Sequence, residues 1–236
     1  MTILQYRVHT QLARLLAEGY RSSEVALKEL VDNAWDADAE TVRISLPAPM
    51  TQGPIMVDDD GSGMTEAELA HEYLLVASDR TQRRGELTAK KKRRAKGRRG
   101  IGKFAGLMAA QTMRLESWAR GQKSSFSLST ADYQAASDIE QLRISVLSEP
   151  DASRPHGTVV TLTDLNQSLA FPDPDKLRQI LLQDYGREDD FRILVNGKSL
   201  DVDDVQGTFS EHVERLPSVG QVKLRFSISA GKRGLR

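Results

Sequence analysis

Two acidic side chains and an amide fall on one side of a helix predicted near the N-terminus. At about 100° per residue, Glu29, Asn33 and Asp36 lie within about 60° of one another, and Asp32 lies one step to the side. A carboxylate can orient a water molecule, and an amide oxygen is a suitable ligand for a hard cation such as Mg²⁺. This face could therefore serve metal-assisted phosphate chemistry, although an ordinary solvated face is the simpler interpretation of this helix alone.

A run of acids and glycines, DDDGSGM at 58–64, follows a strand predicted over 54–58. An aspartate at the end of a buried strand can place its carboxylate at the edge of a pocket, and the glycines let a ligand approach the backbone closely. A tight Asp-Gly turn is the ordinary alternative. Calcium fits less well, because the later glutamate of a calcium-binding loop is missing.

The glycine-rich stretch GRRGIGKFAG at 97–106 matches two nucleotide-binding patterns without their usual context. Residues 97–103 fit a P-loop, but Phe104 stands where a Ser or Thr would ligate magnesium, and basic residues rather than a strand precede it. A dinucleotide-binding turn fails for the same lack of a preceding strand. The glycines could still expose backbone N–H groups to a phosphate at a helix N-terminus, with Lys103 adding positive charge, or simply form a hinge.

Helices predominate in the first half of the predicted pattern and strands in the second, which indicates an α+β two-layer sandwich. The segment HGTVVTLTD at 156–164, taken alone, is an ordinary strand. The predicted helices span 4–18, 23–39, 65–77, 102–111 and 177–184, with Ser22 or Ser23 capping the second and Thr65 the third. The predicted strands span 41–46, 54–58, 112–119, 125–129, 142–147, 158–165, 191–195 and 222–229.

The charge of the chain is unevenly distributed. Its 236 residues hold 33 Lys and Arg against 33 Asp and Glu, and no Cys. The segment 80–103, called here the basic segment, nevertheless carries twelve basic residues and one acid, so its charge is +11 and that of the rest is −11. Such a segment is too charged for a core and is predicted to be a mobile loop. No apolar run reaches the roughly 18 residues of a membrane span and no secretory signal is visible, so a soluble, cytoplasmic protein without membrane contact is expected.

Taken in order, four of these segments resemble a known set of motifs. ELVDN, DDGSGM, GRRGIGKF and HGTVVTLTDL resemble the N, G1, G2 and G3 boxes of the GHKL superfamily, which includes gyrase B, the ninety-kilodalton heat-shock chaperone, histidine kinases and MutL. The resemblance covers about 22–164. GIGKF and the later DFRILVNG look most like prokaryotic chaperone-like and microrchidia (MORC)-like ATP-binding proteins. The resemblance implies a Bergerat-type fold, a two-layer α/β sandwich with a mixed, mostly antiparallel sheet and helices on one face.

The resemblance also implies roles for individual residues. Glu29 matches the general base that polarises the attacking water, Asn33 the ligand of a Mg²⁺ that bridges the phosphates, and Asp59 the acceptor of the adenine amino group. Thr158 matches the threonine that joins Asp59 and a water at the base of the pocket. Further nucleotide contacts are implied for Asp32, Asp36, Gly61, Gly63, Met64, Gly100, Ile101, Gly102, Lys103 and Phe104.

The implied function is Mg²⁺-dependent ATP binding and slow hydrolysis, coupled to a partner by closure of a lid and by nucleotide-dependent homodimerisation. Histidine kinases generally have Asn in place of Glu29, and no phosphoacceptor-His helix is visible, which favours hydrolysis over kinase activity. An ATP-binding domain is expected over 1–206 with its lid at about 79–99. Residues 207–236 would be a linker and the start of a transducer-like domain, which would supply a γ-phosphate contact, so low turnover is expected of this chain alone.

DNA binding is the alternative function, with hydrolysis secondary. The basic segment could contact the phosphate backbone of DNA in a nucleotide-gated manner, and no aromatic residue within it could stack on bases. A solvated lid that only attracts ATP would account for the same charge. The residues expected to contact DNA are Lys90, Lys91, Lys92, Arg93 and Arg94.

Overall fold

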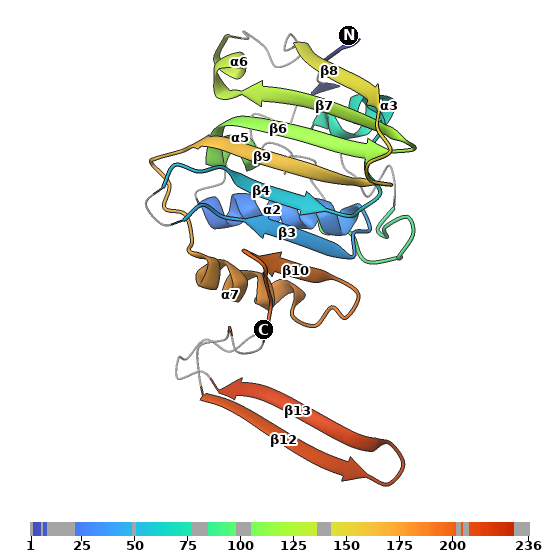
Figure 1. Cartoon of the computed structure of the whole chain (residues 1–236), viewed down its shortest axis with the longest axis vertical. Helices are drawn as coiled ribbons and strands as arrows, with labels where there is room; N and C mark the ends of the chain where they lie inside the picture. The colour runs from blue at the N-terminus through green and yellow to red at the C-terminus, as the bar shows by residue number, and fades with distance from the viewer. Residues whose placement is uncertain are drawn as a thin grey trace.

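A nine-stranded sheet forms the body of the protein in the computed structural model, which describes residues 2–5, 7–8, 22–48, 51–76, 85–97, 105–135, 143–201, 204 and 208–228 (Figure 1). The strand order is β1-β8-β7-β6-β9-β4-β3-β10-β11, and every neighbouring pair is antiparallel except β3 with β10. The strands are β1 Thr2–Gln5, β3 Thr41–Ser45, β4 Ile55–Asp59, β6 Ala110–Ala119, β7 Gln122–Ser129, β8 Arg143–Pro150, β9 Gly157–Leu165, β10 Arg192–Val195 and β11 Lys198–Ser199.

Among the described residues, the helices that share the core of this sheet lie on one of its faces. Helices α2 (Ser23–Asp36), α5 (Ala105–Ala109) and α7 (Pro174–Tyr185) lie behind the strands in Figure 1. Apolar side chains of α2 and of the inward positions of the strands share one buried core, so the two-layer α/β sandwich with helices on one face is confirmed. In the described part of the chain, no helix is long and apolar enough to cross a bilayer.

The cap and the apolar stripe predicted for α2 are both present in the structure. The Ser22 side chain accepts a hydrogen bond from the Val25 N–H at 3.4 Å, which confirms the predicted cap. Leu27, Leu30 and Val31 form the predicted apolar stripe and are buried. The stripe holds the helix against the sheet, so the rest of its surface is available for other contacts.

Smaller elements complete the fold. Thr65 caps α3 (Glu66–Glu68) in a capping box with Glu68, and the helix continues as a π-helical turn, η1 (Leu69–Tyr73). The other elements are β2 Arg7–Val8 paired with β5 Leu75–Val76, α6 Thr130–Ala135, and β12 Thr208–Leu216 paired with β13 Gly220–Ile228. The β12–β13 hairpin shares no strand pairing with the large sheet in the described residues.

The start of the helix predicted over 4–18 is wrong. Residues 2–5 form β1, an edge strand paired with β8 from Thr2 opposite Val146 to Gln5 opposite Arg143, and residues 7–8 form β2. The rest of that prediction lies outside the described residues. Pairing with a strand more than a hundred residues away outweighs the helical spacing of the local sequence, which is a weak preference by itself.

The basic segment has neither helix nor strand where it is described, at 85–97, as expected of a loop, but it is held by internal hydrogen bonds and packs against the body of the protein. Thr88 N–H donates to the Arg93 carbonyl at 2.8 Å, and Ala95 N–H donates to the Glu86 carbonyl at 2.8 Å. Arg93 is only 7% exposed and donates to the Ala39 carbonyl at 2.6 Å. These contacts attach the segment to the end of α2.

Arg93 joins the basic segment to the loop between α7 and β10. Its Nε donates to Asp190 Oδ2 at 3.0 Å, and its guanidinium lies 4.5 Å from the Trp35 ring centre and 5.3 Å from that of Phe191. A side chain buried in this way cannot reach a DNA backbone, so the prediction that Arg93 contacts DNA is wrong.

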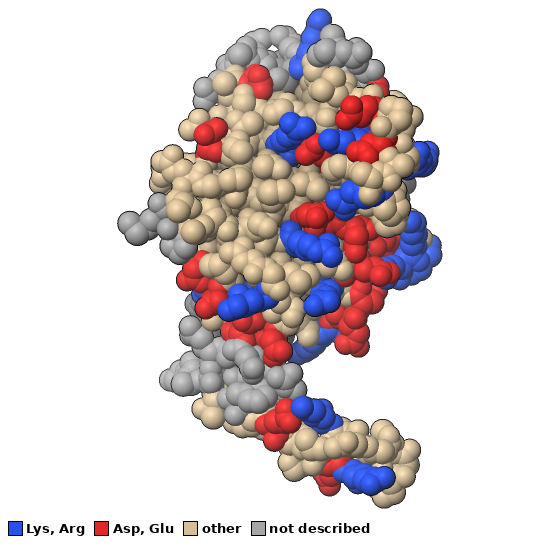
Figure 2. Space-filling view, in the orientation of Figure 1, with Lys and Arg blue, Asp and Glu red and all other residues tan. Residues whose placement is uncertain are grey.

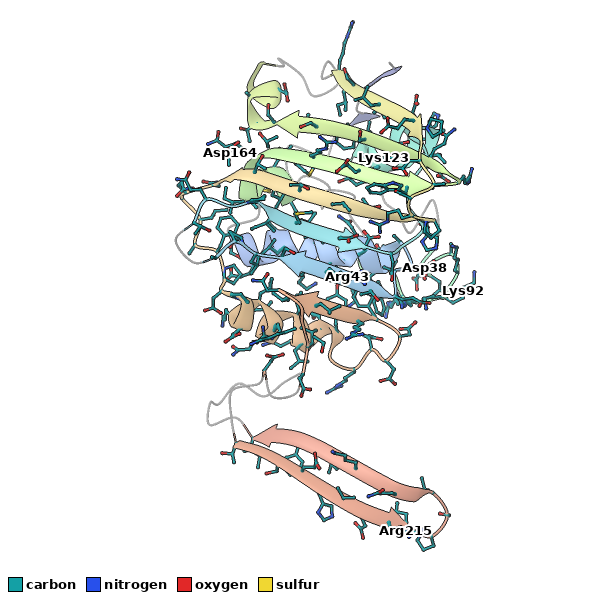
Figure 3. All side chains as sticks on the ribbon, viewed as in Figure 1. Asp38, Arg43, Lys92, Lys123, Asp164 and Arg215 are labelled. Atoms are coloured by element: carbon teal, nitrogen blue, oxygen red, sulfur yellow. The ribbon has the colours of Figure 1, made fainter. Side chains whose placement is uncertain are left out.

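Acidic side chains just after α2 bind residues 90 and 91 of the basic segment. Asp38 accepts from the Lys90 N–H at 2.7 Å and the Lys91 N–H at 3.1 Å, and the Lys91 ammonium pairs with Glu40 at 2.8 Å. Burial disfavours the Asp38 carboxylate, but the Thr88 side chain, these two N–H groups and the charge of Arg93 outweigh it, so the pKa of Asp38 is lowered. Figure 3 shows Asp38 and Lys92 at this edge of the molecule, and Figure 2 shows basic and acidic side chains gathered there.

Replacing Arg93 should therefore destabilise the fold. In Arg93→Ala the carboxylate of Asp190 and the Ala39 carbonyl lose their charged donor, so we expect the free energy of unfolding to fall by about 2–4 kcal/mol. Urea unfolding measures this. Lys92→Ala is the matched control, since Lys92 is an exposed cation of the same segment, and it should change the free energy by less than about 0.5 kcal/mol. Equal effects of the two substitutions would show that Arg93 has no anchoring role.

Candidate functional site

The predicted site residues meet where β4 ends, β9 begins and α2 ends. Asp59, the last residue of β4, is the cross-strand partner of Thr158 in β9. The chain then turns beneath the end of α2, where the Ser62 N–H donates to the Ala37 carbonyl at 2.8 Å. Two segments almost a hundred residues apart are thereby joined to the helix that carries Glu29 and Asn33.

The carboxylate of Asp59 lies on the helix-covered face of the sheet, the same face as Ile55 and Val57. Asp59 is only 8% exposed. Among the described residues, one hydrogen bond reaches its carboxylate, from the Gly61 N–H to Oδ1 at 2.9 Å. Burial raises the pKa of Asp59 to about 7, although that hydrogen bond and the charge of Arg154 favour the ionised form. A buried acceptor of this kind, with one oxygen left over, suits a ligand that brings its own donor.

Two glycines are required at this corner because other groups approach them closely. Gly63 has φ of +61°, and a Cβ there would lie 1.8 Å from the Trp118 carbonyl oxygen. At Gly61 a Cβ would lie 2.8 Å from the Ala37 Cβ and 2.9 Å from Asp59 Oδ1. Any side chain at either position would push the turn away from α2 or β6.

Ser117 connects β6 to this corner, and strand alternation is the one sequence signal that pointed to it. Its hydroxyl accepts from the Met64 N–H at 2.8 Å and lies 3.1 Å from the Thr158 hydroxyl. Ser117 is fully buried and is the cross-strand partner of Thr158. The structure therefore brings Asp59, Gly61, Gly63, Met64 and Thr158 close together, and Ser117 links Met64 to Thr158 within this group.

Glu29 and Asn33 extend the site along α2. The Ala37 N–H donates to the Asn33 carbonyl at 3.0 Å, so Asn33 lies one turn before the corner and Glu29 one turn further. At 1.5 Å per residue, they lie roughly 6 and 12 Å from Ala37 along the helix axis. Both are half-buried, and the Asn33 side chain makes no hydrogen bond to other described residues. An amide oxygen and a carboxylate in this setting fit a hard cation and a water molecule.

Asp36, on the same face, holds the last described residues of the basic segment. Its two carboxylate oxygens accept from the Lys96 N–H and the Gly97 N–H, both at 2.9 Å. Helix α5, which starts at Ala105, also packs against α2. The predicted phosphate-binding residues Gly100, Ile101, Gly102, Lys103 and Phe104 lie outside the described residues, between two stretches that both contact α2.

Asp32 faces α7 instead. It is buried, with one oxygen 2.8 Å from the Lys28 ammonium and the other accepting a short hydrogen bond from the Tyr185 hydroxyl. Burial and the charge of Asp32 raise the pKa of Tyr185 well above its usual range. Asp32 also lines a surface hollow of about 580 Å³ beside Trp35, Lys96 and Asp184. Because both its oxygens are bonded, the geometry favours a link between α2 and α7 over the nucleotide contact that the resemblance implies.

The buried Asp59 carboxylate should cost stability, and this can be measured without a ligand. Its pKa is about 7 in the fold against an ordinary value of 3.8, so the folded state resists ionisation and wild-type stability falls as pH rises between these values. Asp59→Asn keeps an acceptor for the Gly61 N–H and removes the charge. We expect this variant to be more stable than the wild type by about 4 kcal/mol at about pH 8 and by only about 2 kcal/mol at about pH 5.

Urea unfolding at the two pH values measures the difference. Asp60→Asn is a control, since Asp60 is a neighbouring acid whose carboxylate is held by the Glu40 and Thr41 N–H groups. The charge of Asp60 raises the pKa of Asp59 only slightly, so the gain at high pH should be much smaller than that of Asp59→Asn. An Asp59→Asn gain that is the same at both pH values would contradict a raised pKa.

Comparison with known proteins agrees with this geometry. A protein of Herpetosiphon aurantiacus described as a putative type II restriction enzyme, HgiDII, is 28% identical over 157 residues, which cover 65% of this chain and 25% of that protein. The chain thus spans about a quarter of the length of this relative. Residues 20–158 match the family described as histidine kinase-, DNA gyrase B- and HSP90-like ATPases, and they include the α2 face and the whole corner around Asp59. The chain belongs to this family of GHKL-type ATPases.

Proposed function

We propose that this protein binds ATP with Mg²⁺ and hydrolyses it to ADP and phosphate. The observation that carries the proposal is the buried Asp59 carboxylate, which keeps an oxygen without a hydrogen bond from the described residues, in a glycine-lined corner one helix turn from Asn33. Membership of an ATPase family supports it. The adenine would bind at the corner and the phosphates would extend along α2 towards Glu29.

The corner suits adenine because it offers an acceptor in a dry setting. The amino group of adenine would donate to Asp59, and the Thr158 hydroxyl, supported by Ser117, would hold a water between the base and the carboxylate. Gly61 and Gly63 let the turn pack closely against Ala37 and the Trp118 carbonyl, which would hold Asp59 in a fixed position for the base. Discrimination would follow from the buried carboxylate, since a base without the donor would leave it unpaired.

The α2 face would serve the phosphates. Asn33 would hold the Mg²⁺ through its amide oxygen, and the metal ion, when bound, neutralises charge on the phosphate oxygens. Glu29 would accept a hydrogen bond from the attacking water, orient it and take its proton. Hydrolysis of this kind depends mostly on positioning and charge, so a helix fixed against the sheet is a suitable scaffold.

The basic segment would act as the lid. Asp36 binds the Lys96 and Gly97 N–H groups of this segment and lies on the same helix face as Glu29 and Asn33. Nucleotide bound at that face and the position of the segment would therefore influence each other. We also propose low turnover, a nucleotide-dependent homodimer and a microrchidia-like or chaperone-like role in the cytoplasm. The separate β12–β13 hairpin supports a domain boundary near residue 206.

Two substitutions should separate binding from turnover. Asp59→Asn should abolish ATP binding, because the amide presents a donor as well as an acceptor and loses the charge that attracts the adenine amino group. Glu29→Gln should bind ATP within about twofold of the wild type but hydrolyse it at least about 100-fold more slowly, because the water loses its base. Calorimetry with ATP and Mg²⁺ and a phosphate-release assay measure the two effects. Unchanged affinity in the first variant, or wild-type turnover in the second, would refute the corresponding role.

DNA binding is a second candidate function. The relative described as a putative restriction enzyme favours it, and Lys90, Lys92 and Arg94 of the basic segment are exposed. Lys91 is paired with Glu40 and Arg93 is buried, so fewer cations are available than the sequence suggests. Contacts of this kind would be with the phosphate backbone and independent of base sequence.

A salt series tests the DNA contact. The triple variant Lys90→Ala, Lys92→Ala and Arg94→Ala should bind duplex DNA more weakly, and the slope of log K against log salt should fall by about 2–3. Fluorescence anisotropy with a labelled duplex measures both. The control removes three exposed cations elsewhere, Arg143, Lys176 and Lys198, and should leave the slope unchanged. Absence of duplex binding by the wild type at about 50 mM salt would leave only the lid function.

A further inference from the structure

The connection between β8 and β9 braces the turn after Asp59 from the other side of the sheet. Arg154 in this connection donates from Nη2 to the Asp59 carbonyl at 2.5 Å and from Nη1 to Asp58 Oδ1 at 2.9 Å. Its Nε donates to the His156 carbonyl at 3.2 Å. Asp58 lies on the face of β4 opposite the buried Asp59 carboxylate. The guanidinium therefore holds the end of β4 through the backbone of Asp59 and through the side chain of Asp58.

An aromatic ring and an aspartate fix Arg154 in this place. The guanidinium lies 4.9 Å from the ring centre of Trp118, and the Lys123 ammonium lies 5.3 Å from the same ring. Figure 3 labels Lys123 at this part of the sheet. Trp118 Nε1 donates to Asp151 Oδ2 at 2.9 Å, and hydrogen bonds from Ser153 and Trp118 hold the pKa of Asp151 at about 2. The connection is thus tied to β6 independently of β4.

Gly157 makes the approach of Arg154 possible. It has φ of +131°, and a Cβ there would lie 2.1 Å from Arg154 Nη2 and 2.3 Å from the Asp59 carbonyl oxygen. His156 Nδ1 lies 2.7 Å from the Gly61 carbonyl oxygen, at the next point of the same turn. The stretch 154–157 therefore contacts Asp58, Asp59 and Gly61, and a glycine is placed where the guanidinium meets the backbone.

We propose that Arg154 is a positioning residue for the adenine site: it fixes the turn that carries Asp59 and places a positive charge beside it. The inference rests on the proposed ATP binding. It adds to that function a control of base recognition by a residue outside the four sequence motifs, on the opposite face of the sheet from the nucleotide.

The charges around Asp59 determine in which direction loss of Arg154 should move its pKa. On its own strand and turn lie Asp58 and Asp60, which raise the pKa of Asp59, and Asp60 is itself held by the Glu40 and Thr41 N–H groups. From the β8–β9 connection Arg154 opposes burial and lowers that pKa, and His156 faces the Gly61 carbonyl. Loss of the Arg154 charge should therefore move the ionisation of Asp59 to higher pH.

Two variants separate charge from hydrogen bonding. Arg154→Gln keeps donor groups without the charge, and Arg154→Lys keeps the charge. We expect the pH at which ATP affinity is half-maximal to rise by on the order of one unit in Arg154→Gln, with affinity at about pH 7 falling about fivefold and recovering towards about pH 9. Arg154→Lys should stay near the wild-type midpoint. Calorimetry with ATP across this pH range measures the midpoints.

A second readout needs no nucleotide. The carboxyl carbon of Asp59, followed by NMR in the ligand-free protein, should titrate about one unit higher in Arg154→Gln than in the wild type. Arg114→Gln is the matched control, since Arg114 is an arginine of β6 paired with a different acid, Glu116, and it should shift neither readout. An unshifted Asp59 titration in Arg154→Gln, or an equal shift in the control, would overturn the role of Arg154. A wild type whose Asp59 titrates as expected but which binds no ATP would instead overturn the proposed function.

Discussion

Burial of one carboxylate is the constraint on which the rest of the site depends. Asp59 is held in a dry corner at the end of β4, and burial alone would keep it protonated. The surrounding structure offsets part of that cost with the Gly61 N–H on one face of the sheet and the Arg154 charge on the other. The protein thus gives up stability at a position where a ligand can supply the missing donor, as active sites commonly do.

Helix α2 connects this corner to the basic segment and to α7. Its apolar stripe fixes it to the sheet, its end supports the turn after Asp59, and its polar faces hold two other parts of the chain. Asp36 accepts a hydrogen bond from the basic segment, and Asp32 accepts one from Tyr185 of α7. Under the proposed function, a nucleotide bound beside Glu29 and Asn33 would lie on the same helix that contacts both of these parts.

The described part of the basic segment is held against α2 and its neighbours by polar contacts. Arg93 packs against the rings of Trp35 and Phe191 and donates to Asp190 and the Ala39 carbonyl. Glu40 pairs with the Lys91 ammonium, and Asp38 accepts from the Lys90 and Lys91 N–H groups. In the described part of the segment, the charges of Lys91 and Arg93 are used within the fold, whereas Lys90, Lys92 and Arg94 are exposed.

The sequence determined the elements and the residues whose signals are local. The stripe and cap of α2, the strand before Asp59 and the order of the four motifs can all be read from neighbouring residues, and they lead to Asp59, Gly63 and Thr158. Only the tertiary structure decided that residues 2–5 pair as an edge strand, that Ser117 supports Thr158 and that Arg154 braces Asp59. These depend on strand register, and register joins residues that are far apart in the chain and leave no periodic trace in it.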